Sequence, residues 1–190
     1  MKILVYAAMA ALLFGGTACT NLGQKKLAVA STISGPRPKR TFWTVAPVTG
    51  APSIQIVLSD QRAYFYKGTQ LIGESVISSG KKGFETPPGQ YKVIQKDKAH
   101  FSNLYGDYVD DDGNVVQTNV DVSKNPMPDN AALFVGAKMP FFLRFTGGYG
   151  MHAGHLPGYR ASHGCVRMPI AMAEHFFTAA EIGMPVTVMP

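Results

Sequence analysis

Hydrophobic and polar positions alternate over several short segments after residue 53, and this period of two predicts strands. Ile54, Ile56 and Leu58 begin the pattern, and a Lys-Gly-Thr turn at 67–69 joins two further segments in a hairpin. Strands are expected over residues 54–58, 63–66, 71–77, 91–95, 141–145 and 185–189. Residues 97–130 are polar and are predicted to be loops.

A single helix is predicted after residue 168, where the spacing of apolar residues changes to three and four. Apolar side chains from Ile170 to Ala180 would share one buried face. Pro169 suits the first helical position, and Gly183 is expected to end the helix as its C-cap. The chain is therefore predicted to be mainly β with one helix.

The first residues have the pattern of an export signal. Lys2 precedes an apolar run over 3–14, which is too short for a transmembrane helix, and small residues precede Cys19. The segment resembles a bacterial lipoprotein signal, with cleavage after residue 18 and lipidation of Cys19; plain secretion is the alternative. Residues 19–52 are predicted to form a basic, proline-containing tether, and residues 53–190 the folded domain.

Composition changes this picture little. The 190 residues include 46% hydrophobic residues, enough for a core, and 18 Lys and Arg against 12 Asp and Glu give a net charge of +6. There is no dense basic run interleaved with aromatic residues, so nucleic acid is not an expected partner.

The candidate chemistry lies between residues 147 and 168, where the sequence is GGYGMHAGHLPGYRASHGCVRM. If Cys19 is lipidated, Cys165 is a lone thiol in an oxidising compartment, and its presence there calls for a functional explanation. Gly164 lets the backbone approach a substrate carbonyl, and a helix starting near Pro169 would favour a thiolate at Cys165. Together with the nearby histidines, these features are typical of a Cys–His acyl-transfer enzyme.

Two other interpretations of this segment stay open. His152, His155, His163 and Cys165 are four side chains that could bind zinc. Alternatively, Cys165 is a buried, inert residue.

An acidic cluster at residues 107–112 invites a calcium-binding interpretation. It lacks carboxylates at the positions that an EF-hand loop requires, so an exposed hairpin tip at 112–114 is predicted instead.

The motif residues resemble a known family. Met151-His152 and the run Ser162-His-Gly-Cys-Val-Arg-Met168 resemble the signature of the L,D-transpeptidase (YkuD-type) catalytic domain. The likeness extends to SIQIVLSDQRAYFYKGTQL and to TPPGQYKV, and so covers roughly residues 53–190. It implies a β-sandwich-like catalytic domain.

The resemblance also assigns roles to the catalytic residues. Cys165 would be the nucleophile and His152 the proton donor and acceptor, while the backbone N–H groups of Gly164 and Cys165 would line an oxyanion hole shaped by His163. Ala153 follows His152, so a backbone carbonyl rather than a hydroxyl is expected to orient the imidazole.

Three further residues are candidates for substrate contact. Arg167 corresponds to the arginine of the family, either as a structural residue or as an anchor for a substrate carboxylate. Tyr149 and Tyr159 are weaker candidates.

The implied reaction is a two-step acyl transfer on peptidoglycan stem peptides, with no metal or organic cofactor. Cys165 would attack the carbonyl of the third residue and expel D-Ala, and an amine would then resolve the thioester. The acceptor would be another stem peptide, giving a 3→3 cross-link, or a wall-attached lipoprotein. The protein would work in the periplasm, anchored to the outer membrane through Cys19. The alternatives are a hydrolase of the same fold (an L,D-carboxypeptidase or amidase) and a non-catalytic wall-binding module.

Overall fold

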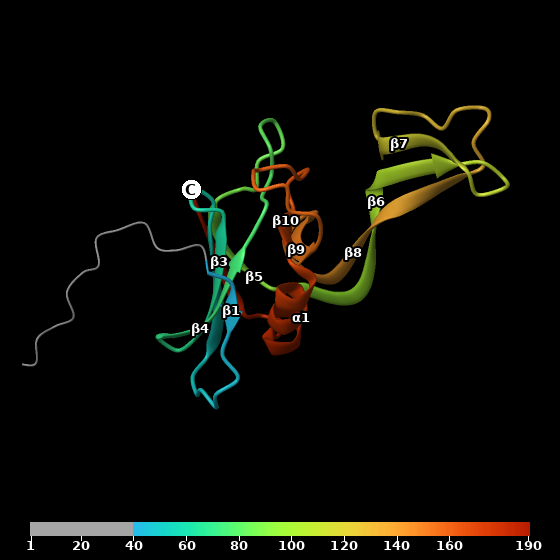
Figure 1. Cartoon of the computed structure of the whole chain (residues 1–190). Helices are drawn as coiled ribbons and strands as arrows, with labels where there is room; N and C mark the ends of the chain where they lie inside the picture. Colours follow the sequence, from blue (N-terminus) through green and yellow to red (C-terminus); the bar gives the residue numbers. More distant parts are fainter. Residues whose placement is uncertain (1–39) are drawn as a thin grey trace, which may run out of the picture. The chain divides into compact units, whose positions relative to one another are not determined.

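The computed structural model describes residues 40–190 as two β-sheets and one helix (Figure 1). The predicted signal peptide, Cys19 and most of the predicted tether lie outside these residues. The mainly β fold class predicted from the sequence is confirmed. In the described part of the chain, no helix is both long and apolar enough to cross a membrane.

The first sheet has six strands in the order β1-β4-β3-β2-β11-β5. Their bounds are β1 Phe42–Trp43, β2 Pro52–Val57, β3 Arg62–Lys67, β4 Gln70–Val76, β5 Gly89–Lys92 and β11 Pro185–Met189. The last strand, β11, lies parallel to β2 with Val186 opposite Ile54, and antiparallel to β5. The last strand of the chain is therefore inserted between β2 and β5.

The second sheet has five strands in the order β10-β9-β8-β6-β7 and carries the candidate motif at one edge. Their bounds are β6 Gln95–Val109, β7 Val115–Asp121, β8 Leu133–Thr146, β9 Tyr149–Ala153 and β10 Val166–Met168. The two motif strands, β9 and β10, are parallel, with Arg167 opposite His152. This pairing brings the two halves of the motif together.

The helix α1, Ile170–Ala179, contributes its buried face to the core between the sheets. Phe176 is fully buried and packs edge-on against Phe65, with ring centroids 5.3 Å apart. Burying a side chain of this size stabilises the fold by about 1.5–3 kcal/mol. The helix following the motif thus fixes β10 against the first sheet.

The predicted helix is right in position but wrong at its ends. It stops at Ala179, and Ala180 is already extended, so Gly183 belongs to the following turn rather than to a C-cap. At the other end the helix begins at Ile170, so Pro169 is the N-cap rather than the first helical residue. Ile170 is exposed, whereas Met172 and Ala173 of the same turn face the core. The period of three and four residues also fits the turn after the helix, which is why the sequence alone places the end too late.

Residues 97–130, predicted to be loops, are largely strand. Most of β6 and all of β7 fall in this range, and with the outer part of β8 they form an arm that extends beyond the sandwich (Figure 1). Most positions in the arm are accessible to solvent, so they show no alternation of apolar and polar residues to mark a strand. The prediction failed for that reason.

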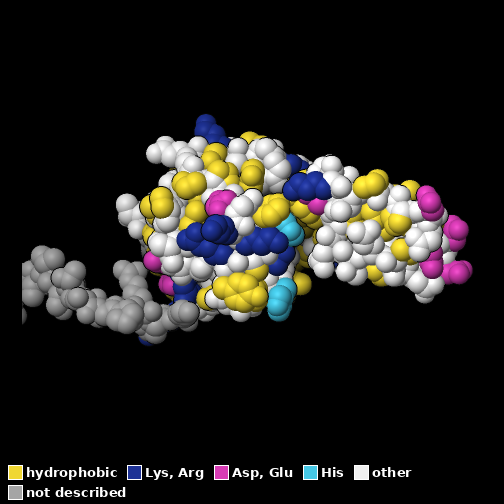
Figure 2. All heavy atoms as spheres, turned by 90° about the horizontal axis from the view of Figure 1, so that it is seen from above, with side chains coloured by type: hydrophobic (Ala, Val, Ile, Leu, Met, Phe, Trp, Pro, Cys, Tyr) yellow, Lys and Arg dark blue, Asp and Glu magenta, His cyan; other side chains and the backbone are white. Residues whose placement is uncertain are grey.

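The tip of the arm is the predicted turn at residues 112–114. Asp110 accepts backbone N–H groups from Asp112 and Asn114, and Gly113 has a φ of +82°. Acidic side chains gather at the far end of the arm, whereas Lys and Arg side chains gather on the sandwich (Figure 2).

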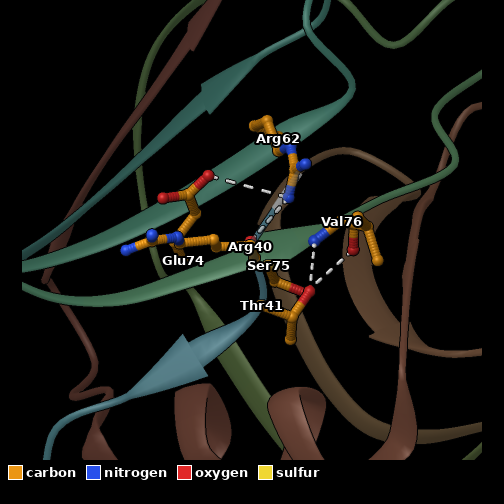
Figure 3. A network of polar contacts seen from close by, with 6 residues as sticks. All are labelled: Arg40, Thr41, Arg62, Glu74, Ser75 and Val76. Carbon is orange, nitrogen blue, oxygen red and sulfur yellow. Dashed lines mark hydrogen bonds and ion pairs between the residues drawn. The ribbon is translucent and has the colours of Figure 1, made fainter. Parts of the chain in front are cut away.

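Residues before β2 also contribute to the first sheet. Trp43 lies in β1, pairs with Gly73 of β4 and stacks on His175 of α1 with ring centroids 5.1 Å apart. Figure 3 shows how the residues before β1 join the sheet: buried Arg62 donates to the carbonyl of Arg40 at 2.7 Å and pairs with Glu74. Residues 40–52 therefore belong to the folded domain.

Candidate active site

A cavity of about 490 Å³ lies where the motif loop meets β6, β8 and β9. It is lined by three of the predicted catalytic and site-shaping residues, Cys165, His152 and His163, and by Tyr149 and Arg167. The structure thus brings together five of the side chains to which the sequence assigned a role in the reaction. His155, named only as a possible zinc ligand, also lines the cavity. The side chain of Tyr159 is exposed and is not among the residues that line this cavity.

The loop that carries Cys165 is held by residues 78–86 of the chain. Ser79 accepts the backbone N–H of Ser162 at 3.1 Å through its carbonyl, and Ser78 exchanges two backbone hydrogen bonds with Arg167. Buried Thr86 donates its hydroxyl to the carbonyl of Gly164 at 2.7 Å. These bonds fix the backbone on both sides of Cys165 against the end of β4.

Gly164 occupies a position that only glycine suits. Its φ is +111°, and a Cβ added there would lie 2.4 Å from the ring of Tyr149. Its N–H donates to the Ser162 hydroxyl at 3.1 Å, and that hydroxyl in turn donates to the carbonyl of Cys165. The expectation that the Gly164 N–H lines an oxyanion hole therefore needs correction, because this donor is already engaged within the loop.

His152 is buried, and its orientation follows from one hydrogen bond. Its Nδ1 lies 2.8 Å from the carbonyl oxygen of Ala153. A carbonyl only accepts, so Nδ1 carries the proton and Nε2 keeps its lone pair. This confirms the predicted backbone carbonyl as the orienting group. Burial lowers the pKa of His152 from 6.5 to about 4, so the ring is neutral at pH 7.

Cys165 is half-buried and is held as a thiol. Its Sγ lies 3.6 Å from the carbonyl oxygen of Gly148, to which it donates. Burial raises the pKa of the thiol, and this effect exceeds the opposite influence of the Gly150 backbone N–H and of Arg144 and Arg167. The expectation of a resting thiolate is therefore not met, because the thiol donates to a carbonyl and its burial raises its pKa.

His163 forms one wall of the cavity rather than joining His152. Its ring stacks on Tyr105 with centroids 4.4 Å apart and meets Phe84 edge-on at 4.8 Å. Tyr105 reaches it because β6 bulges between Phe101 and Gly106, where the register with β8 shifts. Burial lowers the pKa of His163. This aromatic stack supports the predicted role of shaping the site.

Arg144 is a cavity residue that the sequence analysis missed. Its guanidinium donates to Gln95 and to the carbonyl of Gly147, each at 2.7 Å. Arg144 therefore fixes the turn at Gly147. The carbonyl of the next residue, Gly148, accepts the hydrogen bond from the Cys165 thiol.

The other cavity and loop residues that the sequence did not reveal differ in whether a motif marks them. Thr86 begins the Thr-Pro-Pro-Gly turn, which belongs to the family resemblance, and that turn was the available signal. Tyr105 and Arg144 lie in segments without a motif, so nothing in the sequence alone marks them.

The zinc interpretation has no support from side-chain placement. Across residues 40–190, no group of three or more His, Cys, Asp or Glu side chains lies close enough together to hold a metal ion.

The stability of the domain is expected to fall as the pH drops from 7 to 5. The folded state keeps His152 unprotonated down to about pH 4, whereas the unfolded chain binds a proton near 6.5. The unfolded state therefore binds more protons in this window, and stability is lost as the pH falls. We expect about 2 kcal/mol less free energy of unfolding at pH 5 from this residue. Urea denaturation at both pH values measures it.

The matched control is a His152→Gln variant, which has no imidazole to protonate. Its loss of stability between pH 7 and 5 should be smaller than that of the unchanged protein by about 2 kcal/mol. Equal losses in both proteins would show that the burial of His152 does not have this effect.

The two-sheet fold thus carries a Ser-His-Gly-Cys loop beside a buried histidine, at one edge of the second sheet. The chain belongs to the YkuD family of L,D-transpeptidase catalytic domains, whose family model matches residues 51–188. Members of this family are typically cysteine enzymes that act on peptidoglycan peptides of the cell wall, outside the cytoplasm. The predicted family is confirmed.

Solved structures share the fold at low sequence identity. An L,D-transpeptidase from Stackebrandtia nassauensis is 17% identical over 76% of this chain and 58% of its own, with a TM-score of 0.54. One from Mycobacterium smegmatis is 15% identical over 74% and 59%, with a TM-score of 0.56. An L,D-transpeptidase in complex with imipenem is 17% identical over 73% and 59%, with a TM-score of 0.55.

The chain spans about three fifths of the length of these structures. No curated protein matches it in sequence.

Proposed function

We propose that this chain is a peptidoglycan L,D-transpeptidase in which Cys165 is the nucleophile and His152 its proton acceptor and donor. The observation that carries the proposal is the state of His152: its Nδ1–H is held by the carbonyl of Ala153, and the ring is neutral. Its Nε2 is therefore a base, in the same cavity as the Cys165 thiol.

The raised pKa of the Cys165 thiol suggests how the first step begins. Because thiol and imidazole are both neutral at rest, the proton would move from Sγ to His152 as the sulfur attacks. The sulfur would form a bond to the carbonyl carbon of the third residue of the stem peptide. His152 would then pass its proton to the departing amine of D-Ala, leaving a thioester on Cys165.

The arginines of the cavity suggest the polarity of the substrate. Arg144 and Arg167 line it, and neither has an ion pair with a carboxylate among those of the described residues. A stem peptide carries free carboxylates, which such guanidinium groups bind well. We assign Arg167 to a substrate carboxylate on this basis. Tyr149, in contact with Gly164, would form the floor below the scissile bond.

Product analysis after incubation with disaccharide-tetrapeptide tests the proposed reaction. Mass spectrometry should find dimers joined by 3→3 links, together with released D-Ala. Tripeptide without dimer would instead identify a hydrolase of the same fold. Unchanged tetrapeptide would favour a non-catalytic wall-binding module and would overturn the proposal.

The location proposed for the protein is the periplasm, with a lipid anchor on Cys19 in the outer membrane. The N-terminal sequence pattern supports this proposal, and wall chemistry outside the cytoplasm agrees with it. A Cys19→Ser variant is expected to move from the membrane fraction to the soluble periplasmic fraction, because acyl chains supply the membrane affinity. Unchanged membrane association of the variant would contradict lipidation.

A further inference from the structure

A second imidazole lines the same cavity and is not used in the first step. His100 of β6 belongs to the cavity wall, and its Nδ1 lies 2.9 Å from a carboxylate oxygen of Asp97. The other oxygen of Asp97 accepts the N–H of Ala99 at 3.1 Å. The hydrogen bond from His100 holds the pKa of the Asp97 carboxyl below its usual range, so this partner is ionised at neutral pH.

The pair faces an irregular stretch of backbone. Residues 97 and 100 are three apart, so a regular strand would direct their side chains to opposite faces. Here the opposing strand β8 contains Phe141 at a φ of +59°, and Lys98 has no Cα partner in the ladder between β6 and β8. Such a conformation is costly for a non-glycine residue, and such costs are often found at functional sites.

One aromatic ring connects His100 to the catalytic histidine. His100 stacks flat on Phe142, with centroids 4.2 Å apart and an angle of 8° between the planes. Phe142 is fully buried and also lies beside His152, with centroids 6.2 Å apart. The two imidazoles are therefore fixed near each other in one cavity, one bonded to a carbonyl and the other to a carboxylate.

The positive charge of the cavity disfavours the entry of an amine acceptor in its ammonium form. Among the described residues that line it there are the cations Lys138, Arg144 and Arg167, and none is Asp or Glu. An amine acceptor is an ammonium at neutral pH, and these cations disfavour its entry in that form. An ammonium also has no lone pair with which to attack a thioester. It must lose a proton on the way in.

We propose that His100, held by Asp97, removes this proton from the incoming ammonium in the second half-reaction. The inference rests on the acyl transfer proposed above. His100 takes one proton from the ammonium, and Asp97 stabilises the imidazolium that forms. The neutral amine then attacks the thioester: a C–N bond forms and the C–S bond breaks. The second proton of the amine passes through His152 to the sulfur, and His100 releases its proton to solvent.

The test separates acylation from aminolysis in His100→Gln and Asp97→Asn variants. Intact mass measures how fast the tetrapeptide donor acylates Cys165, and product analysis measures dimer against hydrolysed tripeptide. We expect acylation within about twofold of the unchanged protein. Aminolysis by the stem-peptide ammonium should fall about 10²-fold in His100→Gln, the lower end of what a positioned base supplies. Asp97→Asn, which keeps an acceptor for the ring and so preserves its packing, should lose about tenfold.

A second acceptor distinguishes proton removal from a structural role. Hydroxylamine is uncharged at neutral pH and has no ammonium proton to lose, so both variants should react with it as fast as the unchanged protein does. Lys98→Gln, an exposed neighbour between the two residues, is the control and should behave as the unchanged protein with both acceptors. Equal losses with both acceptors, or no loss with the stem peptide, would overturn the inference. A failure of the unchanged protein to become acylated would instead overturn the proposed function.

Discussion

A Cys165→Ala variant is expected to form no cross-linked dimer and no tripeptide from disaccharide-tetrapeptide. Without the sulfur there is no atom to form the thioester, and Cys165 is the single cysteine among the described residues. The expected loss is complete rather than partial, because both transfer and hydrolysis pass through the same acyl-enzyme. Product analysis by mass spectrometry over a long incubation measures it.

The fold of this variant should be unchanged, since the loop is held by backbone bonds and by the hydroxyls of Ser162 and Thr86, not by the thiol. Its circular dichroism and its thermal midpoint provide the control. Product formation by a folded Cys165→Ala protein would mean that another group performs the reaction.

A His152→Gln variant is expected to acylate Cys165 about 10²–10⁴-fold more slowly, the range that a positioned acid or base supplies. The effect should be large because the thiol is neutral at rest: with its pKa raised by burial, little thiolate exists without a base to take the proton. Reactions quenched at successive times and analysed by intact mass measure the rate. Peptide mapping should find the adduct on Cys165, as in the unchanged protein.

His175→Gln is the matched control for this change. His175 stacks on Trp43 and is not among the residues that line the cavity, so its loss should leave the acylation rate within about twofold. Equal rates for His152→Gln and the unchanged protein would show that His152 is not the base.

Much of the sandwich could be predicted from the sequence because its strands have one buried face. Ile54 and Ile56 alternate with more exposed neighbours, and Val186 and Val188 do the same in β11. The arm could not be predicted, since the buried positions of β6 and β7 there, such as Tyr108 and Val120, are too few to impose a period of two.

In the site, too, local features could be predicted from the sequence and features that depend on distant residues could not. The positions of His152 and Cys165 were predictable because they stand in a short motif, and Ala153 correctly indicated a carbonyl as the partner of the imidazole. The protonation state was not predictable, because it depends on burial by residues far away in the sequence. His100 was missed for the same reason: it lies near His152 only because both rings contact Phe142, some forty residues further along the chain than His100.

The central claim, that Cys165 is a nucleophile activated within this cavity, is tested most directly by intact mass after incubation with imipenem. The strained carbonyl of this carbapenem resembles an activated amide, and a solved L,D-transpeptidase with this fold is in complex with it. The account predicts that the domain gains the mass of one imipenem and that peptide mapping places it on Cys165. An unmodified domain, or an adduct on any other residue, would contradict it.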